Sequence, residues 1–97
     1  MADEPVGHLA VGVDRGPVRE AASYHGGALK TTSGGAGTVD VYDGFDATGE
    51  LIDTFQAAAS DVDVHIFERG LQLRSGIYVD LGSNVSAFTL YYIPGKR

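Results

Sequence analysis

The sequence predicts an all-β protein: a small antiparallel β-sandwich or jelly-roll-like barrel of seven or eight short strands. Three observations support this. The apolar residues fall in short runs, Gly is abundant with 14 residues among 97, and Gly, Asp, Ser and Thr separate the runs. This spacing is typical of strands joined by tight turns. The length suits one domain, which we divide into an N-terminal arm with a short edge strand, 1–20, and a β-sandwich domain, 21–97.

The strand patterns differ in clarity. Segment 38–43 alternates most cleanly, with Val39 and Val41 on one face and Asp40 and Tyr42 on the other. The adjacent glycines at 26–27 predict a bulge within their strand. The predicted strands are 9–13, 23–33, 38–43, 51–56, 62–67, 71–74, 77–82 and 85–93.

The connecting segments carry turn signals. Asp46 and Gly49 occupy the first and fourth positions that a type I turn favours, and 14–17 has the composition of a turn. If 71–74 and 77–82 pair, a three-residue loop at 74–76 sets Leu73 opposite Ile77 and keeps the apolar residues on one face. Helical patterns at 18–23 and 55–60 are too short to determine the fold.

The last strand, 85–93, is apolar on both faces. Phe88, Leu90 and Tyr92 share one face, and the other also carries apolar side chains such as Ile93. A small antiparallel sheet normally exposes one face to water. We therefore expect the second face to be covered, either by segment 9–13 or by another subunit.

The composition argues against several classes of function. Thirteen acidic residues face seven Lys and Arg, for a net charge of −6, whereas nucleic-acid binding requires clustered cations. There is no Cys, and therefore no disulfide framework. No apolar run is long enough to cross a membrane, and the N-terminus lacks signal-peptide features. We expect a complete soluble product that folds where it is made, from a salt-loving host or a GC-rich genome.

The candidate chemical motifs are weak. The carboxylates of segment 40–50 lack calcium-loop spacing, and segment 31–38 lacks the Lys and the following helix of a phosphate-binding loop. His8, His25 and His65 are far apart, and His65 is expected on a solvated strand face. Glu50 and Glu68 could pair as in a sugar hydrolase, but a short chain has little room for a cleft. We expect no enzyme, metal or cofactor.

The sequence has five Tyr and no Trp. Exposed tyrosines on a sheet can serve as platforms for sugars, although tyrosines also fill cores. A non-catalytic carbohydrate-binding module is therefore one alternative function.

Three segments carry a recognisable pattern: 37–51 (GTVDVYDGFDATGEL), 70–79 (GLQLRSGIYV) and 85–92 (VSAFTLYY). Together they resemble small β-sandwich structural proteins of tailed bacterial and archaeal viruses, and the resemblance covers roughly 24–93. The sequence departs from the pattern in the bulkier residues 87–90 and the longer N-terminal segment. The resemblance implies a virion location after synthesis in the host cytoplasm, with no catalytic residues to transfer.

The expected role is that of a capsid decoration (cement) protein, with a tail, head-tail connector or fibre subunit as the alternative. Its partner would be the major capsid protein or another virion protein. We expect a homo-oligomer, with a trimer favoured, and neither nucleic-acid nor membrane binding. The residues expected to bind a partner are Val6, His8, Leu9, Val11, Tyr91 and Ile93.

Overall fold

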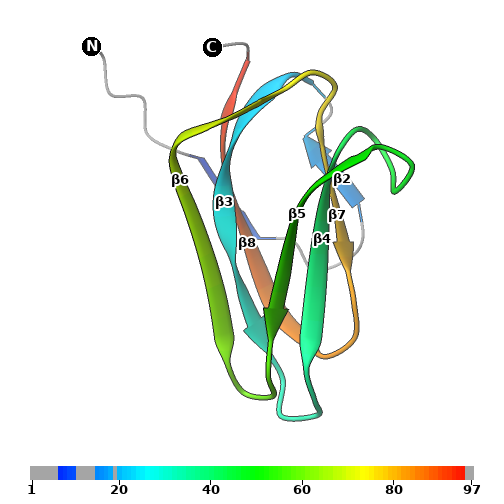
Figure 1. Cartoon of the computed structure of the whole chain (residues 1–97), viewed down its shortest axis with the longest axis vertical. Helices are drawn as coiled ribbons and strands as arrows, with labels where there is room; N and C mark the ends of the chain where they lie inside the picture. The colour runs from blue at the N-terminus through cyan, green and yellow to red at the C-terminus, as the bar shows by residue number, and fades with distance from the viewer. Residues whose placement is uncertain (1–6, 11–14, 19, 96–97) are drawn as a thin grey trace.

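The computed structural model describes residues 7–10, 15–18 and 20–95, the first two segments by their backbone (Figure 1). Every regular element within these residues is a β-strand. The strands are β1 (Gly7–Ala10), β2 (Arg15–Val18), β3 (Ala22–Thr31), β4 (Gly37–Asp43), β5 (Glu50–Ala57), β6 (Val62–Leu73), β7 (Ile77–Leu81) and β8 (Val85–Pro94). The prediction of an all-β chain is confirmed.

The strands form two four-stranded antiparallel sheets with the orders β1-β8-β3-β6 and β2-β7-β4-β5. The pairing is nested along the chain: β1 pairs with β8, β2 with β7, β3 with β6 and β4 with β5. The two sheets are not closed into a barrel, so the barrel alternative was wrong. Among the described residues, side-chain contacts link edge strands β5 and β6, and no backbone ladder joins them.

One apolar core joins the inner faces of the two sheets. Phe55 of β5 meets Phe88 of β8 edge to face, with ring centroids 5.0 Å apart. Full burial of a large apolar side chain contributes roughly 1.5–3 kcal/mol, so this shared core is the main force holding the sheets together. Its buried members are Ala22, Tyr24, Leu29, Val39, Val41, Phe55, Leu73, Ile77, Val79, Phe88 and Leu90.

Several local predictions are confirmed. Val39 and Val41 are fully buried, as the alternation of β4 predicts. The β3 ladders shift register around Gly26 and Gly27, where a bulge was expected. The N–H of Gly49 donates to the carbonyl of Asp46 at 3.2 Å, which closes the predicted turn.

Other local predictions were wrong. Residues 15–17 of the predicted turn 14–17 belong to strand β2. Segments 62–67 and 71–73 belong to the single strand β6, and β5 continues to Ala57 with no helix. The 74–76 connection is not a hairpin, because β6 and β7 belong to different sheets. Leu73 and Ile77 are both buried, so their parity reflected a shared core and not a shared ladder.

The N-terminal segment was one of two candidates to cover the second face of the last strand, and its described part lies beside that strand instead. Residues 7–10 pair beside β8, with His8 opposite Tyr91 and Leu9 opposite Leu90. Over these residues the segment widens the sheet, and 11–13 lie outside the described residues. The segment expected to be an arm, 1–20, thus contributes one edge strand to each sheet.

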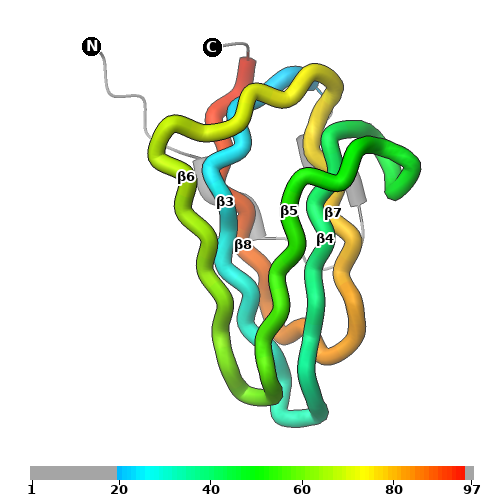
Figure 2. Tube along the Cα trace, viewed as in Figure 1, coloured from blue at the N-terminus to red at the C-terminus, as the bar shows by residue number. Residues whose placement is uncertain are grey.

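The opposite edges of the two sheets are β6 and β5. The chain passes directly from β5 to β6, so these strands lie close together where the connection joins them and diverge toward their other ends (Figure 2). These two edge strands, β5 and β6, carry most of the exposed large apolar residues of the described chain.

Candidate functional site

Edge strand β6 exposes a row of apolar side chains to solvent. Val62, Val64 and Ile66 have exposed fractions of 59%, 52% and 61%. They alternate along the strand, so they lie on one face. We refer to these three side chains as the β6 stripe. Water contact with such a row is unfavourable, and exposed apolar patches often mark interaction sites.

The pairing of β6 with β3 explains why this stripe faces outward. Asp63 pairs with Leu29, whose side chain is fully buried, and paired residues share a face of a sheet. Asp63 and His65 therefore face the other sheet, and the stripe faces solvent. The prediction that His65 lies on the solvated face of its strand was wrong. The strand alternates as expected, but its polar face is the inner one.

A polar network holds the inner side of β6 against β5. His65 Nδ1 lies 2.9 Å from Asp53 Oδ2, and its Nε2 lies 3.3 Å from Asp63 Oδ2. The His65 ring also stacks on Phe55, with centroids 4.0 Å apart. A neutral imidazole carries one N–H, so only the protonated ring can donate toward both carboxylates. This network fixes the distance between the two edge strands.

The network continues into the core through Tyr24. Its hydroxyl donates to Asp53 Oδ2 at 2.7 Å. Burial raises the pKa of Tyr24 above its ordinary value, and the hydrogen bond and charge of Asp53 raise it further. Asp53 thus connects β3, β5 and β6. The arrangement has the chemistry of a structural tie, since each polar group is satisfied by another.

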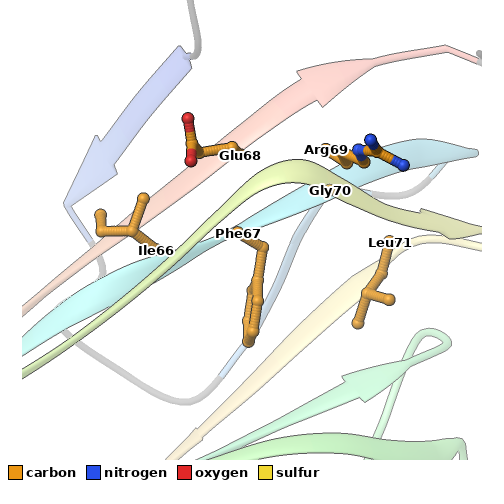
Figure 3. A pocket seen from close by; sticks show the side chains of 6 residues that line it. All are labelled: Ile66, Phe67, Glu68, Arg69, Gly70 and Leu71. Atoms are coloured by element: carbon orange, nitrogen blue, oxygen red, sulfur yellow. The ribbon is translucent and has the colours of Figure 1, made fainter.

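The far end of β6 forms a shallow groove lined by residues 66–71 (Figure 3). The β3–β6 ladder shifts here: Gly26 pairs with Ile66 and Tyr24 pairs with Leu71, so residues 67–70 bulge from the strand. His25 Nδ1 lies 2.8 Å from the carbonyl oxygen of Phe67, which fixes the bulge. Figure 3 shows Ile66 and Phe67 pointing in different directions. Ile66 lines the groove and is also the last residue of the stripe, so the groove continues the stripe along the edge.

The six residues predicted to bind a partner are placed as follows. Val6 and Val11 lie outside the described residues, and His8 and Leu9 belong to β1, described by its backbone. Tyr91 is half-buried, and Ile93 is only 6% exposed. Sequence reasoning missed the β6 stripe. The alternation of 62–67 was the available signal, but it does not say which face points outward.

The carboxylates of segment 40–50 make separate local contacts. Asp46 accepts hydrogen bonds from the hydroxyl of Thr48 and from its backbone N–H, the latter at 2.9 Å. These two bonds, the hydroxyl bond first, lower the pKa of Asp46. Asp43 instead accepts the N–H groups of Arg74 and Ser75. Over the described residues, no group of three or more His, Cys, Asp or Glu is arranged to hold a metal ion.

A tyrosine pair lies on the outer face of the second sheet. Tyr42 of β4 is opposite Tyr78 of β7, with ring centroids 6.2 Å apart and planes tilted by 51°. Asp40 and Asp80 form the neighbouring cross-strand pair. Partial desolvation and the charges of Asp40 and Asp80 raise the pKa of Tyr42. Aromatic rings beside carboxylates are groups that can contact a sugar.

No helix long and apolar enough to cross a membrane occurs in the described part of the chain. Comparisons with protein-family models, curated proteins and solved structures found no match to this chain.

Proposed function

We propose that this protein is a virion structural protein that decorates the capsid of a tailed virus. The observation that carries the proposal is the β6 stripe: three large apolar side chains more than half exposed on one strand edge. A surface of this kind favours a protein partner over water. The resemblance of segments 37–51, 70–79 and 85–92 to virion proteins gives the class of partner, a capsid or other virion protein.

We further propose that the fold is a jelly roll within the all-β class. Two four-stranded sheets whose strands pair first with last, second with seventh and so on support this assignment. A hairpin of four nested strand pairs, rolled into two sheets, is the jelly-roll pattern. Jelly rolls occur in viral capsid proteins and in lectins, so the fold is compatible with both the virion role and the sugar-binding alternative.

The mechanism of decoration is many modest contacts repeated by symmetry. Each copy would bind the shell through the N-terminal segment and one sheet edge. Because neighbouring copies also contact one another, loss of one contact does not release the copy, and avidity supplies the retention. The proposal therefore requires an oligomer and a shell site that repeats over the head.

The test is co-sedimentation of the purified full chain with virions and empty capsids of the virus that encodes it, at native salt. The expected result is saturable binding to both particles with many copies per head. A chain that stays monomeric and remains in the supernatant contradicts the proposal. A labelled antibody separates the alternatives, because decoration labels the whole head, whereas a connector, tail or fibre subunit labels one vertex or the tail.

A second candidate function, a carbohydrate-binding module, is favoured by the pair of Tyr42 and Tyr78. The expected result on a glycan array is binding that Tyr42→Ala abolishes. Tyr91→Ala, on the other sheet, is the matched control and should retain binding. An array without signal for the wild-type chain excludes this candidate.

A further inference from the structure

The backbone of β6 is directed so that it can accept another strand. The N–H of Thr31 donates to the carbonyl of Asp61 at 3.0 Å, next to the Lys30–Val62 pair in an unshifted ladder. Backbone polar groups alternate in direction along a strand. Asp63 and His65 therefore direct their N–H and C=O groups toward β3. The three stripe residues direct theirs toward the free edge of the sheet.

We propose that β6 pairs with β6 of a second copy of this chain, antiparallel and two-fold symmetric about Val64. In this register each Val64 is opposite the partner's Val64, and each Val62 is opposite the partner's Ile66. The inference rests on the proposed function in one respect, because it names the first partner of the assembly.

Two observations select this register. Among residues 62–66, only the stripe residues can form hydrogen-bonded pairs across the edge. Because they occupy every second position, the two-fold axis must pass through a residue and not between two residues. A centre at Asp63 would set two carboxylates opposite each other, and a centre at His65 would oppose two imidazoles. A centre at Val64 instead sets each Asp63 opposite the partner's His65, which avoids both like pairs and is charge-complementary when the ring is protonated.

The outer face gains a continuous apolar surface in this register. Val62, Val64 and Ile66 of one copy lie beside the same three residues of the other, so each stripe loses water contact along the shared edge while the combined apolar face stays open on the outer side. Val62 already donates its N–H to the carboxylate of Asp61 at 2.8 Å. Each Ile66 N–H can still donate to the carbonyl of the partner's Val62, and the two Val64 residues exchange both bonds.

The inner face explains why charged residues at this edge do not prevent pairing. Inward-pointing charges are one device by which proteins protect a sheet edge. Asp63 and His65 have opposite charge when the ring is protonated, so the two-fold axis matches them instead of opposing them. Non-hydrogen-bonded pairs such as this one bring Cα atoms to about 4.5 Å. The two-fold contact forms a dimer, whereas the trimer expected from the sequence would need a different contact.

The first test is the mass of the full chain by light scattering over a concentration series. The wild-type chain is expected to reach twice the mass of one chain. Val64→Lys sets two ammonium groups at the two-fold axis and is expected to remain monomeric. Leu51→Lys, at a side chain of the second sheet that is 53% exposed, adds the same charge and should still dimerise.

The second test reads the register directly, because the chain contains no Cys. Val64→Cys places two thiols in one cross-strand pair, whose Cα separation of about 5.5 Å suits a disulfide. It should give a covalent dimer on mild oxidation. Val62→Cys and Ile66→Cys, each made singly, should not, whereas the double variant should.

The outcomes separate this inference from the proposed function. A monomeric wild-type chain, a Val64→Lys dimer, or equal crosslinking at positions 62 and 64 overturns the β6 pairing. Urea unfolding of each variant shows whether a loss of dimer is a loss of fold, and the cysteine series tests the register even if Val64→Lys fails to fold. A dimer with the correct crosslinks that ignores capsids supports the inference and contradicts the decoration role.

Discussion

Gly26 is the residue at which the backbone of β3 depends most on lacking a side chain. Its φ angle is 105°, a region that L-residues rarely adopt. A Cβ at this position would collide with the backbone carbonyl of His65 on the neighbouring strand. The close approach of β3 and β6 at the bulge therefore requires Gly.

We predict that Gly26→Ala lowers the free energy of unfolding by roughly 3 kcal/mol, from backbone strain and overpacking together. Gly95→Ala is the control, because Gly95 also has a positive φ angle, 90°, but a Cβ there meets nothing within 4 Å. The control should cost about 1 kcal/mol from strain alone. Urea unfolding measures both, and equal losses would contradict the close-approach explanation.

Tyr24 makes the free energy of unfolding depend on pH in the alkaline range. Burial and Asp53 raise its pKa in the folded chain above the value of 10.0 for an unperturbed Tyr. The folded state therefore holds a proton that the unfolded state loses above pH 10, so stability is full below that pH and falls as pH rises. The expected slope is about 1.4 kcal/mol per pH unit from this group.

The measurement is urea unfolding at a series of pH values on both sides of 10. Tyr24→Phe should be less stable at neutral pH, since Asp53 loses a hydrogen bond, yet should lose less stability between pH 10 and 11. A variant whose alkaline loss equals that of the wild type would exclude Tyr24 as the source.

At the scale of elements, β6 joins the two sheets through its inner face. Asp53 and His65 have side-chain exposed fractions of 12% and 26%, and their contact bridges β5 and β6. Arg74 and Glu50 form an ion pair of 3.9 Å with exposed fractions of 84% and 71%. The two pairs contrast a partly buried contact between sheet edges with a solvated surface contact.

We predict a coupling free energy of about 1–2 kcal/mol for Asp53 and His65, since charge-assisted hydrogen bonds are stronger when shielded from water. For Arg74 and Glu50 we predict a value near zero. Double-mutant cycles with Ala at each position, read by urea unfolding, measure both couplings. Similar values for the two pairs would mean that the polar network does not tie the sheets together.

The whole molecule has a non-local topology. The outermost strand pairs, β1 with β8 and β2 with β7, join the two ends of the chain. Among the four nested pairs, only β4 with β5 joins strands that are adjacent in the sequence. The loop-closure entropy of the outer pairs must be met before their contacts form.

We therefore predict folding on a millisecond-to-second timescale, as for other β proteins with distant pairings. Stopped-flow dilution from urea, followed by fluorescence of the five Tyr, measures the rate. Folding in microseconds would show that the outer pairs do not limit the transition state.

The alternation of individual strands could be predicted, but its direction could not always be. In β4, one face carries Val39 and Val41 and the other carries Asp40. The face without a carboxylate is the apolar one, so the buried face was clear from the sequence. In 62–67 the same rule placed His65 on the solvated face of the strand. The opposite holds because Asp63 and His65 find partners on β5 that the sequence does not place nearby.

The sequence by itself determined the all-β class, the positions of most strands, the bulge at 26–27 and the turn at 46–49, because these follow from local alternation and backbone preference. Only the tertiary structure decided which strands share a sheet and which face of β6 points outward. Those outcomes depend on contacts between residues distant in the chain, such as Asp53 with Tyr24 and His65, and local patterns carry no information about such contacts.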